Sequence, residues 1–404
     1  MNGAPLAGKR VADFTWVWAG PYASMLLALL GAEVIKIESS KRMDTARRGA
    51  YSTGQRYNDP NVSAVFNTVN LNKLSVTLNL STSKGVELAK RIVAISDVAV
   101  QNMRPGAMER LGLGYEDLRK IKPDIIMLSS SALGSTGPER TYVGYANNFS
   151  SFSGASYFAG HEGGPPNELS GSIDLRSGTA ACLAILCALY YRERTGRGQH
   201  IDLSSPETIS VLVGDLLMDY TMNGRVVERM GNRDRVMAPH NCYRCKGDGA
   251  WVSIAIGSDS EWRDFGAAIG SPEWTRDPRF ADAFRRWKHR DELDRLVSAW
   301  CAERTPDEVT GALSPAGIAV APAATSETLY KSAHIRERGL FADVQHPAMN
   351  KQVVIGTPWK LASAPQPVSR HAPLMGEHNH YVLGELLGLT EEEIRTLQGE
   401  QVLV

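Results

Sequence analysis

Short runs of β-branched and aromatic residues alternate with longer apolar segments of helical spacing along the first half of the chain. One run covers residues 10–14, and a Gly-Pro break, an apolar helical segment at 22–30 and a second run at 33–37 follow it. This spacing predicts strand–helix–strand units, and therefore an α/β fold whose parallel sheet is covered by helices on both faces. We expect further strands at 74–78, 97–100, 125–129 and 200–203, and helices at 84–95, 115–121 and 177–195.

The pattern changes after residue 223. A polar, basic segment at 224–235 resembles a linker, and beyond it a strand is expected at 250–256 and another at 318–321. The predicted organisation is a large domain at 1–223, a small α+β domain at 224–330, and a segment at 331–404 that returns to the large domain. That last segment begins with a proline-rich extended stretch containing Pro358, Pro365, Pro367 and Pro373. The other expected elements are helices at 261–269, 289–303, 306–313, 381–387 and 391–397, and a strand at 352–355.

Composition excludes several classes of protein. The 404 residues carry 44 Lys and Arg against 44 Asp and Glu, so no broad positive field draws the chain to nucleic acid or to anionic membranes. The longest apolar stretches, 22–30 and 180–191, are shorter than the ~20 residues of a membrane span. The beginning of the chain shows no signal-peptide pattern, and the five cysteines are too scattered for a disulfide framework. We therefore expect a cytoplasmic protein with reduced thiols.

The common signatures of catalytic and metal sites are missing from the sequence. It contains no G-x-S-x-G elbow and no phosphate-binding P-loop, and Gly112-Leu-Gly114 lacks the third glycine of a dinucleotide fingerprint. Cys242 and Cys245 have the spacing of half a zinc site, but no second C-x-x-C pair accompanies them. Nucleotide hydrolysis, hydride transfer and structural zinc therefore lose support.

Four polar residues lie in loops beside predicted strands. Lys73 comes just before one strand, and Asn102 and Arg104 come just after another, with Arg110 further along. Loops at the carboxyl ends of parallel strands line the ligand crevice, so these side chains are candidates for holding a phosphate by charge-assisted hydrogen bonds. An alternative interpretation is that they are ordinary solvated loop residues.

Asp174 stands between a glycine-flanked turn and a long apolar helix. Its simplest role there is to cap the helix by accepting backbone N–H bonds. The same position would also suit a nucleophile, because backbone N–H groups at a helix start can stabilise an oxyanion.

Several blocks in the same order resemble the class III CoA-transferase family over nearly the whole chain. They begin with Trp18-Ala-Gly-Pro21 and Leu30-Gly-Ala-Glu-Val-Ile-Lys-Ile-Glu38. The resemblance continues through Asn70–Ser75, Gln101–Gly106, Leu111-Gly-Leu113, Gly134-Ser-Thr-Gly-Pro138, Arg194-Thr-Gly-Arg-Gly-Gln199 and Pro373-Leu-Met-Gly-Glu-His378.

The resemblance implies a Rossmann-like large domain, a smaller domain and a dimer whose two chains are interlinked like rings. It also implies that Asp174 is the nucleophile, because the family's catalytic aspartate matches this position. The implied reaction proceeds through aspartyl anhydrides and an aspartyl-CoA thioester. Coenzyme A then enters as a thioester substrate, and neither a metal nor a resident cofactor is expected.

The family's CoA contacts match ten positions of this chain. They are Val17, Trp18, Ala19, Asn72, Lys73, Ser75, Asn102, Met103, Arg110 and Tyr145. Two departures concern the adenosine phosphates, since Ser39 and Leu74 stand where many members have arginines. Lys41, Arg42, Lys73 or Arg104 would have to replace those cations, and Arg104 is therefore added to the expected CoA-binding residues.

The resemblance leaves more than one function open. The family's α-methylacyl-CoA racemases use a His and an Asp, and both are absent from the matching stretch Gly144–Phe149, which favours transfer. Residues 237–242 lack the glycines of the formyl-CoA transferase loop, which argues against formate and oxalate. A heteromeric assembly subunit and a carnitine-type or other dicarboxylate transferase remain alternatives.

Among the branches, the chain resembles most the succinyl-CoA:benzylsuccinate CoA-transferases of anaerobic aromatic degradation. Aromatic residues near the expected acyl site would suit an aromatic acid. They are Trp16, Trp18, Tyr22, Tyr145, Phe149 and Phe152.

Overall fold

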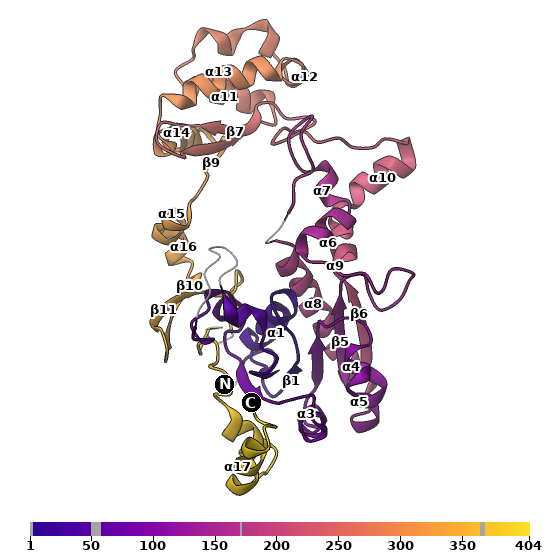
Figure 1. Ribbon diagram of the computed structural model, residues 1–404. Helices are drawn as coiled ribbons and strands as arrows, with labels where there is room; N and C mark the ends of the chain where they lie inside the picture. The colour runs from indigo at the N-terminus through magenta and orange to yellow at the C-terminus, as the bar shows by residue number, and fades with distance from the viewer. Residues whose placement is uncertain (1–2, 50–57, 170–171, 364–367) are drawn as a thin grey trace. The chain divides into compact units, whose positions relative to one another are not determined.

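The computed structural model describes residues 3–49, 58–169, 172–363 and 368–404 (Figure 1). The chain divides into two compact units. The large unit comprises Met1–Ser156, Glu168–Arg225 and Arg336–Val404, and the small unit comprises Tyr157–Asn167 and Val226–Ile335. The segment Tyr157–Asn167, which the sequence analysis assigned to the first domain, belongs to the small unit.

A six-stranded sheet forms the centre of the large unit. All of its strands are parallel, in the order β3-β2-β1-β4-β5-β6, which confirms the predicted α/β fold. The order reverses between β1 and β4, so loops at the carboxyl ends of these two strands diverge and leave room for a ligand. The strands are β1 (Arg10–Asp13), β2 (Glu33–Glu38), β3 (Leu74–Thr77), β4 (Val98–Gln101), β5 (Ile126–Ser131) and β6 (Gln199–Ser204).

Helices cover both faces of this sheet, and the alternation of side chains along each strand divides the core accordingly. Val11 packs in one apolar cluster with α1 (Ala19–Leu29) and α8 (Ile173–Thr195). Its neighbour Ala12 packs in the other cluster, with α3, α5, η6 and α17. Successive strand residues point to opposite faces, so both faces are buried. These last four helices are α3 (Ser83–Ala94), α5 (Tyr115–Ile121), η6 (Tyr381–Leu386) and α17 (Glu391–Gly399).

Helix α8 is four residues longer at its start than the predicted helix 177–195. It is long and apolar enough to cross a membrane by length and composition. In this structure it packs along α1 and beside β5 and β6, with its inner face in the core. This packing accounts for the apolar residues on the inner face of α8.

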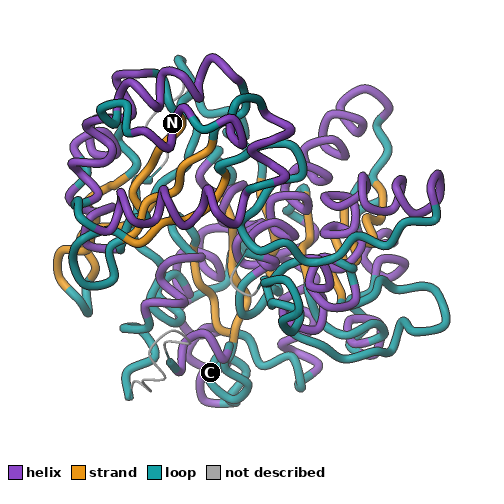
Figure 2. The backbone as a smooth tube through the Cα atoms, turned by 90° about the horizontal axis from the view of Figure 1, so that it is seen from above, coloured by secondary structure: helices purple, strands orange, loops and turns teal. Residues whose placement is uncertain are grey.

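The rest of the large unit consists of shorter elements and an antiparallel hairpin. The hairpin pairs β10 (Phe341–His346) with β11 (Asn350–Ile355), whereas the sequence predicted only the second strand. Pro365 and Pro367 of the expected extended stretch lie outside the described residues. The shorter elements are η1 (Thr45–Arg48), α2 (Ala64–Val69), α4 (Ala107–Arg110), α6 (Ala146–Phe152), α9 (Ser205–Ser210), η2 (Val211–Val213) and α10 (Gly214–Asn223). Figure 2 shows the helices, strands and loops along the backbone.

The small unit contains a three-stranded antiparallel sheet in the order β7-β8-β9. The sequence analysis missed β7 (His240–Arg244) because its residues are mostly polar. In this strand Cys242 is exposed, and the following Cys245 is buried. The other elements include β8 (Trp251–Ala255), β9 (Ala319–Pro322), α11 (Asp259–Ala268), η3 (Glu273–Arg276), η4 (Pro278–Phe280), α12 (Ala283–Lys288), α13 (Arg290–Ala302), α14 (Pro306–Leu313), η5 (Ser314–Ala316) and α15 (Ser326–Lys331), with α7 (Ala155–Phe158) and α16 (Ala333–Glu337) at the boundaries between the units.

A network of buried charges lies beside the carboxyl end of β1. The ammonium of Lys73 is fully buried and lies 2.9 Å from Asp13 Oδ2. It also donates to Ser24 Oγ, Asn70 Oδ1 and the Pro21 carbonyl at 2.8–2.9 Å. Burial lowers the pKa of Lys73 to about 8, against the opposing charge of Asp13. Burial would raise the pKa of Asp13, but the Lys73 and Lys36 charges outweigh it and hold that pKa below its usual range. Both partners are therefore ionised at neutral pH, and each depends on the other for compensation.

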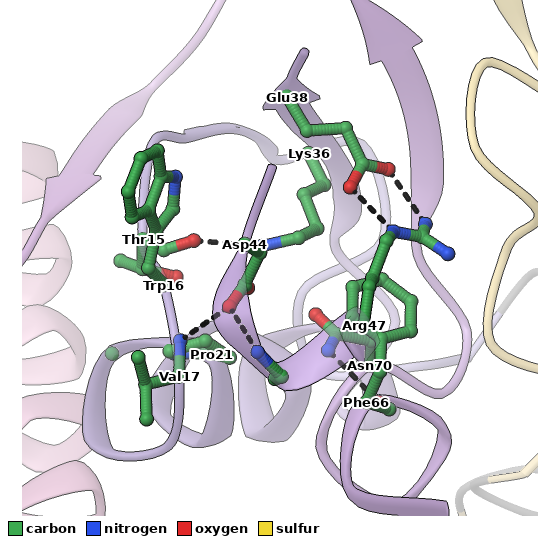
Figure 3. Close-up of polar contacts among 12 residues, drawn as sticks. Thr15, Trp16, Val17, Pro21, Lys36, Glu38, Asp44, Arg47, Phe66 and Asn70 are labelled. Atoms are coloured by element: carbon green, nitrogen blue, oxygen red, sulfur yellow. Dashed lines mark hydrogen bonds and ion pairs between the residues drawn. The ribbon is translucent and has the colours of Figure 1, made fainter. Parts of the chain in front are cut away.

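Two further ion pairs extend the network (Figure 3). Lys36 lies 3.4 Å from Asp44 Oδ2. Arg47 binds both oxygens of Glu38 at 2.7 Å. Burial would raise the pKa of Glu38, but the Arg47 guanidinium outweighs it and holds that pKa below its usual range. Three carboxylates and three cations are thus enclosed together and balance one another.

We predict that Lys73→Met destabilises the protein by about 3–5 kcal/mol, because it leaves Asp13 as a buried carboxylate without its nearest cation. Urea unfolding measures the change. Lys84→Met is the matched control, since Lys84 pairs with Glu400 on the surface, where salt bridges contribute little. Equal unfolding midpoints for the two variants would contradict this account of the network.

Candidate active site

A cavity of about 550 Å³ lies at the point where the strand order of the large sheet reverses. The loops that follow β1, β4 and β5 line it, together with the start of α8. This is the place where open α/β sheets bind their ligands. The lining residues are Val17, Trp18, Ala19, Asn102, Met103, Arg104, Pro105, Ser130, Ser131, Ala132, Tyr142, Val143, Gly144, Tyr145, Ala146, Phe149, Asp174 and Ser205.

The turn after β1 has a backbone conformation that few side chains adopt. Val17 has a φ of 70°, which is unfavourable for a β-branched residue. Two side chains from elsewhere in the chain hold the turn. Asp44 Oδ1 accepts the Val17 N–H at 3.1 Å (Figure 3), and the Asn102 amide both accepts from Trp16 N and donates to Trp16 O at 2.8 Å. The buried network therefore fixes one wall of the cavity.

Asp174 lies in the first turn of α8, one residue after Ile173. Ser172 occupies the N-cap position, without a capping bond from its side chain, so the prediction that Asp174 is the N-cap is wrong. Its carboxylate is half-buried, and no residue that the structure describes donates a hydrogen bond to it. Ser170 and Gly171, which precede the cap, lie outside the described residues. Burial raises the pKa of Asp174 above the ordinary 3.8. This carboxylate is thus held at the cavity without a partner in the described ranges of the chain.

A close approach of two helices sets the position of Asp174. Gly178 lies one turn further along α8, on the same face. A Cβ atom at Gly178 would lie only 2.6 Å from the carbonyl oxygen of Ala19, at the start of α1. Only glycine lets α8 approach so closely, and this contact brings Asp174 to the Val17–Ala19 turn.

We predict that Gly178→Ala separates the starts of α1 and α8. The expected cost is about 1–3 kcal/mol of stability from overpacking, together with a loss of catalytic activity from misplacement of Asp174. Gly311→Ala, inside α14, is the control, because a Cβ there meets nothing within 4 Å and should slightly stabilise the helix. Thermal unfolding and turnover measurements test both, and identical behaviour would contradict the packing argument.

The structure brings eight of the predicted site residues together at one cavity. They are Asp174, Val17, Trp18, Ala19, Asn102, Met103, Arg104 and Tyr145. Arg104 and Tyr145 are exposed, and Tyr145 retains 77% of its accessible surface, so both lie at the mouth of the cavity. Asn102 combines two roles there, since it lines the cavity and also holds the Trp16 backbone.

Four predicted residues lie elsewhere. Lys73 and Ser75 are fully buried, and Ser75 Oγ donates to Glu38 at 2.5 Å. The proposal that the Lys73 ammonium replaces a phosphate-binding arginine is therefore corrected: Lys73 precedes its strand, points inward and is held by Asp13. Asn72 lines a different cavity and accepts backbone N–H bonds from Ser369 and Arg370.

Arg110 is exposed on α4, outside the lining of the cavity. The Arg110 guanidinium lies against the loop that follows β4. A Cβ atom built on Gly106 of that loop would be 3.1 Å from Arg110 Nη1. Lys41 and Arg42 are also exposed, and the Arg42 guanidinium lies 5.3 Å from the Trp16 ring centre. Arg104 and Arg110 are thus the predicted cations on this loop and the helix that follows it.

Sequence reasoning missed several lining residues, among them Ser131, Ser205 and Tyr142. Three consecutive serines end β5, at the edge of the sheet where ligands bind, and this position is the signal that could have revealed them. Of the predicted aromatic residues, Trp18, Tyr145 and Phe149 line the cavity. The other three, Trp16, Tyr22 and Phe152, are not among the lining residues.

The stretch Gly144–Phe149, where a racemase of this family would carry its His and Asp, contributes four residues to the cavity wall. None of the six residues in this stretch is an acid or a histidine. The wall beside Asp174 therefore lacks the proton-transferring pair at this position.

Comparison with known proteins agrees with this fold and site. The model of CoA-transferase family III matches residues 6–379. The succinyl-CoA–D-citramalate CoA-transferase of Chloroflexus aurantiacus is 32% identical, over 99% of this chain and 98% of the relative. The beta subunit of the succinyl-CoA–L-malate CoA-transferase of the same organism is also 32% identical, with the same coverage. A CAIB/BAIF family protein from Brucella suis has a solved structure with a TM-score of 0.86 and 29% identity, over 95% of this chain and all of that one.

The chain therefore belongs to CoA-transferase family III and is an enzyme of this class. Its substrates are CoA thioesters, as throughout the family. Coenzyme A is accordingly a substrate of this protein.

Proposed function

We propose that this enzyme moves coenzyme A from succinyl-CoA to a small dicarboxylic acid, with Asp174 as the nucleophile. One observation carries the proposal: the Asp174 carboxylate is half-buried, has no hydrogen-bond partner among the described residues and lines the cavity at the switch point of the sheet. A carboxylate that serves only the fold would be exposed or paired.

The reaction begins with attack of an Asp174 oxygen on the thioester carbonyl of succinyl-CoA. The C–S bond breaks, CoA leaves as a thiolate, and a mixed anhydride joins succinate to Asp174. The thiolate then attacks the aspartyl carbonyl, so that succinate leaves as a carboxylate and an aspartyl-CoA thioester remains. No proton is consumed, and the energy of the thioester is retained in each intermediate.

The second half repeats these steps in reverse with the acceptor. An acceptor carboxylate attacks the aspartyl thioester, releases CoA thiolate and forms a second anhydride. The thiolate attacks the acceptor's carbonyl, and Asp174 leaves as the free carboxylate. Water would hydrolyse either anhydride, so closing the cavity around the bound substrates protects the intermediates.

The cations of the loop after β4 suggest how CoA lies in the cavity. Arg104 is exposed at the mouth, and Arg110 lies against the same loop. We assign the CoA phosphates to these arginines, because guanidinium groups bind phosphate in a bidentate manner. The thioester then extends inward past Val17 and Met103 to Asp174.

The relatives guide the choice of acceptor. Two of them are named for succinyl-CoA together with D-citramalate or L-malate, which are short aliphatic hydroxy dicarboxylates. We therefore propose an acceptor of that kind. (R)-2-Benzylsuccinate is the second candidate, because Trp18, Tyr145 and Phe149 give the cavity an aromatic wall. A carnitine-type acceptor is the third candidate, and no described residue of the cavity specifically favours it.

The subunit arrangement is part of the proposal. One relative is a beta subunit, which suggests pairing with a homologous chain, and the family resemblance suggests an interlinked dimer. The exposed apolar side chains of η2 and α10, including Val211, Leu217, Met218 and Met222, support burial against another chain. Homodimer and heterodimer are both consistent with this surface.

We predict that Asp174→Asn lowers CoA exchange between succinyl-CoA and acceptor at least about 10³-fold. Its melting temperature should equal or exceed that of the wild type at pH 7. The raised pKa means that the stabilising contribution of Asp174 is present at low pH and is lost as the carboxyl ionises, so removing the charge relieves a cost. Asp307→Asn, at the same helical position of α14 but exposed, should retain full activity. Exchange by the Asp174 variant would refute the assignment.

The wild-type pH profile gives a related expectation. Because only the ionised carboxylate attacks, exchange should fall as the pH is lowered through the raised pKa of Asp174. The midpoint of this acid limb should therefore lie above the ordinary 3.8. A limb centred below 3.8 would contradict the desolvated position of the nucleophile.

For the acceptor, we predict that malate, citramalate or a related aliphatic dicarboxylate gives the highest kcat/KM with succinyl-CoA. The screen compares these acids with (R)-2-benzylsuccinate and carnitine, and monitors the new acyl-CoA by chromatography. It is run with this chain alone and with a homologous subunit from the same source. Preference for benzylsuccinate would replace the aliphatic assignment with the aromatic one.

A further inference from the structure

Ser131 is a buried serine that neither the fold nor the reaction described above uses. It is the last residue of β5 and pairs in register with Ser204 of β6. Ser131 is 9% exposed, and its Oγ has no hydrogen-bond partner among the residues that the structure describes. Ser131 lines the same cavity as Asp174. The Oγ itself is enclosed at this strand end, so it would reach a ligand in the cavity only by a turn about χ1, the one side-chain torsion of serine.

Neighbouring serines show how unusual this position is. Ser129 Oγ, two residues earlier on the same strand, is 2.8 Å from His200 Nε2. Ser204 Oγ accepts the Glu207 N–H and caps α9. These hydroxyls have partners within the protein, whereas a buried hydroxyl without one carries an uncompensated desolvation penalty. Unpaired buried hydroxyls of this kind occur at functional sites, where the bound substrate supplies the missing hydrogen-bond partner.

The depth of Ser131 indicates which part of the substrate it meets. The exposed lining residues of the cavity stand at its mouth, and they are Arg104, Tyr142, Val143 and Tyr145. Ser131 is buried at the sheet edge, on the inner side. With the CoA phosphates at the mouth, the group that reaches the inner side is the acyl end, whose carbonyl oxygen is a hydrogen-bond acceptor.

We propose that the Ser131 hydroxyl donates a hydrogen bond to the carbonyl oxygen of the acyl group under attack by Asp174. As the Asp174 oxygen bonds to the carbonyl carbon, negative charge builds on that carbonyl oxygen, and the hydrogen bond becomes stronger. The proton stays on Ser131, and no covalent bond to serine forms or breaks. This inference rests on the proposed function and adds a catalytic residue to it.

The test compares Ser131→Ala with Ser177→Ala. Ser177 is the matched control, because its Oγ is likewise buried with no partner in the described part of the chain, yet it does not line the cavity. Ser131→Ala should lower kcat for CoA exchange about 10- to 100-fold, with KM for succinyl-CoA within twofold of the wild type. Ser177→Ala should keep the wild-type kcat. Both variants should melt at or above the wild-type temperature, since each removes an unsatisfied buried hydroxyl.

Each outcome separates this inference from the proposed function. An unchanged kcat in Ser131→Ala, alongside an inactive Asp174→Asn, would overturn the role of Ser131 and leave the nucleophile in place. A fall in kcat matched by a fall in melting temperature would assign Ser131 a structural role and overturn the proposal. A wild-type protein that exchanges no CoA with any acceptor would overturn the proposed function, and the inference with it.

Discussion

The enclosure of three carboxylates and three cations beside the carboxyl end of β1 is the constraint on which the site depends. Burying a single ion costs several kcal/mol, so such a cluster is stable only when every charge has a partner and further hydrogen bonds. Lys73 meets this condition with four acceptors, and Arg47 meets it with both oxygens of Glu38. The network can therefore assume essentially one arrangement.

That arrangement fixes the substrate cavity in two steps. Asp44, paired with Lys36, also accepts the N–H of Val17 and so holds a backbone conformation that valine rarely adopts. The turn then leads directly into α1. The carbonyl oxygen of Ala19, the first residue of α1, lies so close to Gly178 of α8 that no larger residue would fit there. Asp174, one turn before Gly178, is placed by this contact. A chain of close contacts thus connects buried charges to an unpaired carboxylate.

Much of the fold could be predicted from the sequence because short continuous apolar runs, typical of parallel strands buried on both faces, alternate with segments of helical spacing. The α/β class and the parallel sheet follow from that pattern. The ends of individual helices and strands were predicted less accurately, and two of these errors fall at the candidate active site. Asp174 and Arg176 interrupt the apolar pattern, so the start of α8 was predicted too late and Asp174 was interpreted as a cap. The serines at the end of β5 left Ser131 beyond the predicted strand. Burial of a charged side chain could not be predicted either. Lys73 was expected in a loop, and nothing in that position reveals that its ammonium is fully buried.

The role of Asp174 as a covalent nucleophile is the central claim, and capture of the aspartyl-CoA thioester tests it most directly. The enzyme is incubated with succinyl-CoA and then treated with borohydride, which reduces a thioester to a primary alcohol, and its peptides are mapped by mass spectrometry. We predict conversion at Asp174 alone, dependent on succinyl-CoA. Conversion of another residue, or an unmodified Asp174 in enzyme that is exchanging CoA, would contradict the account.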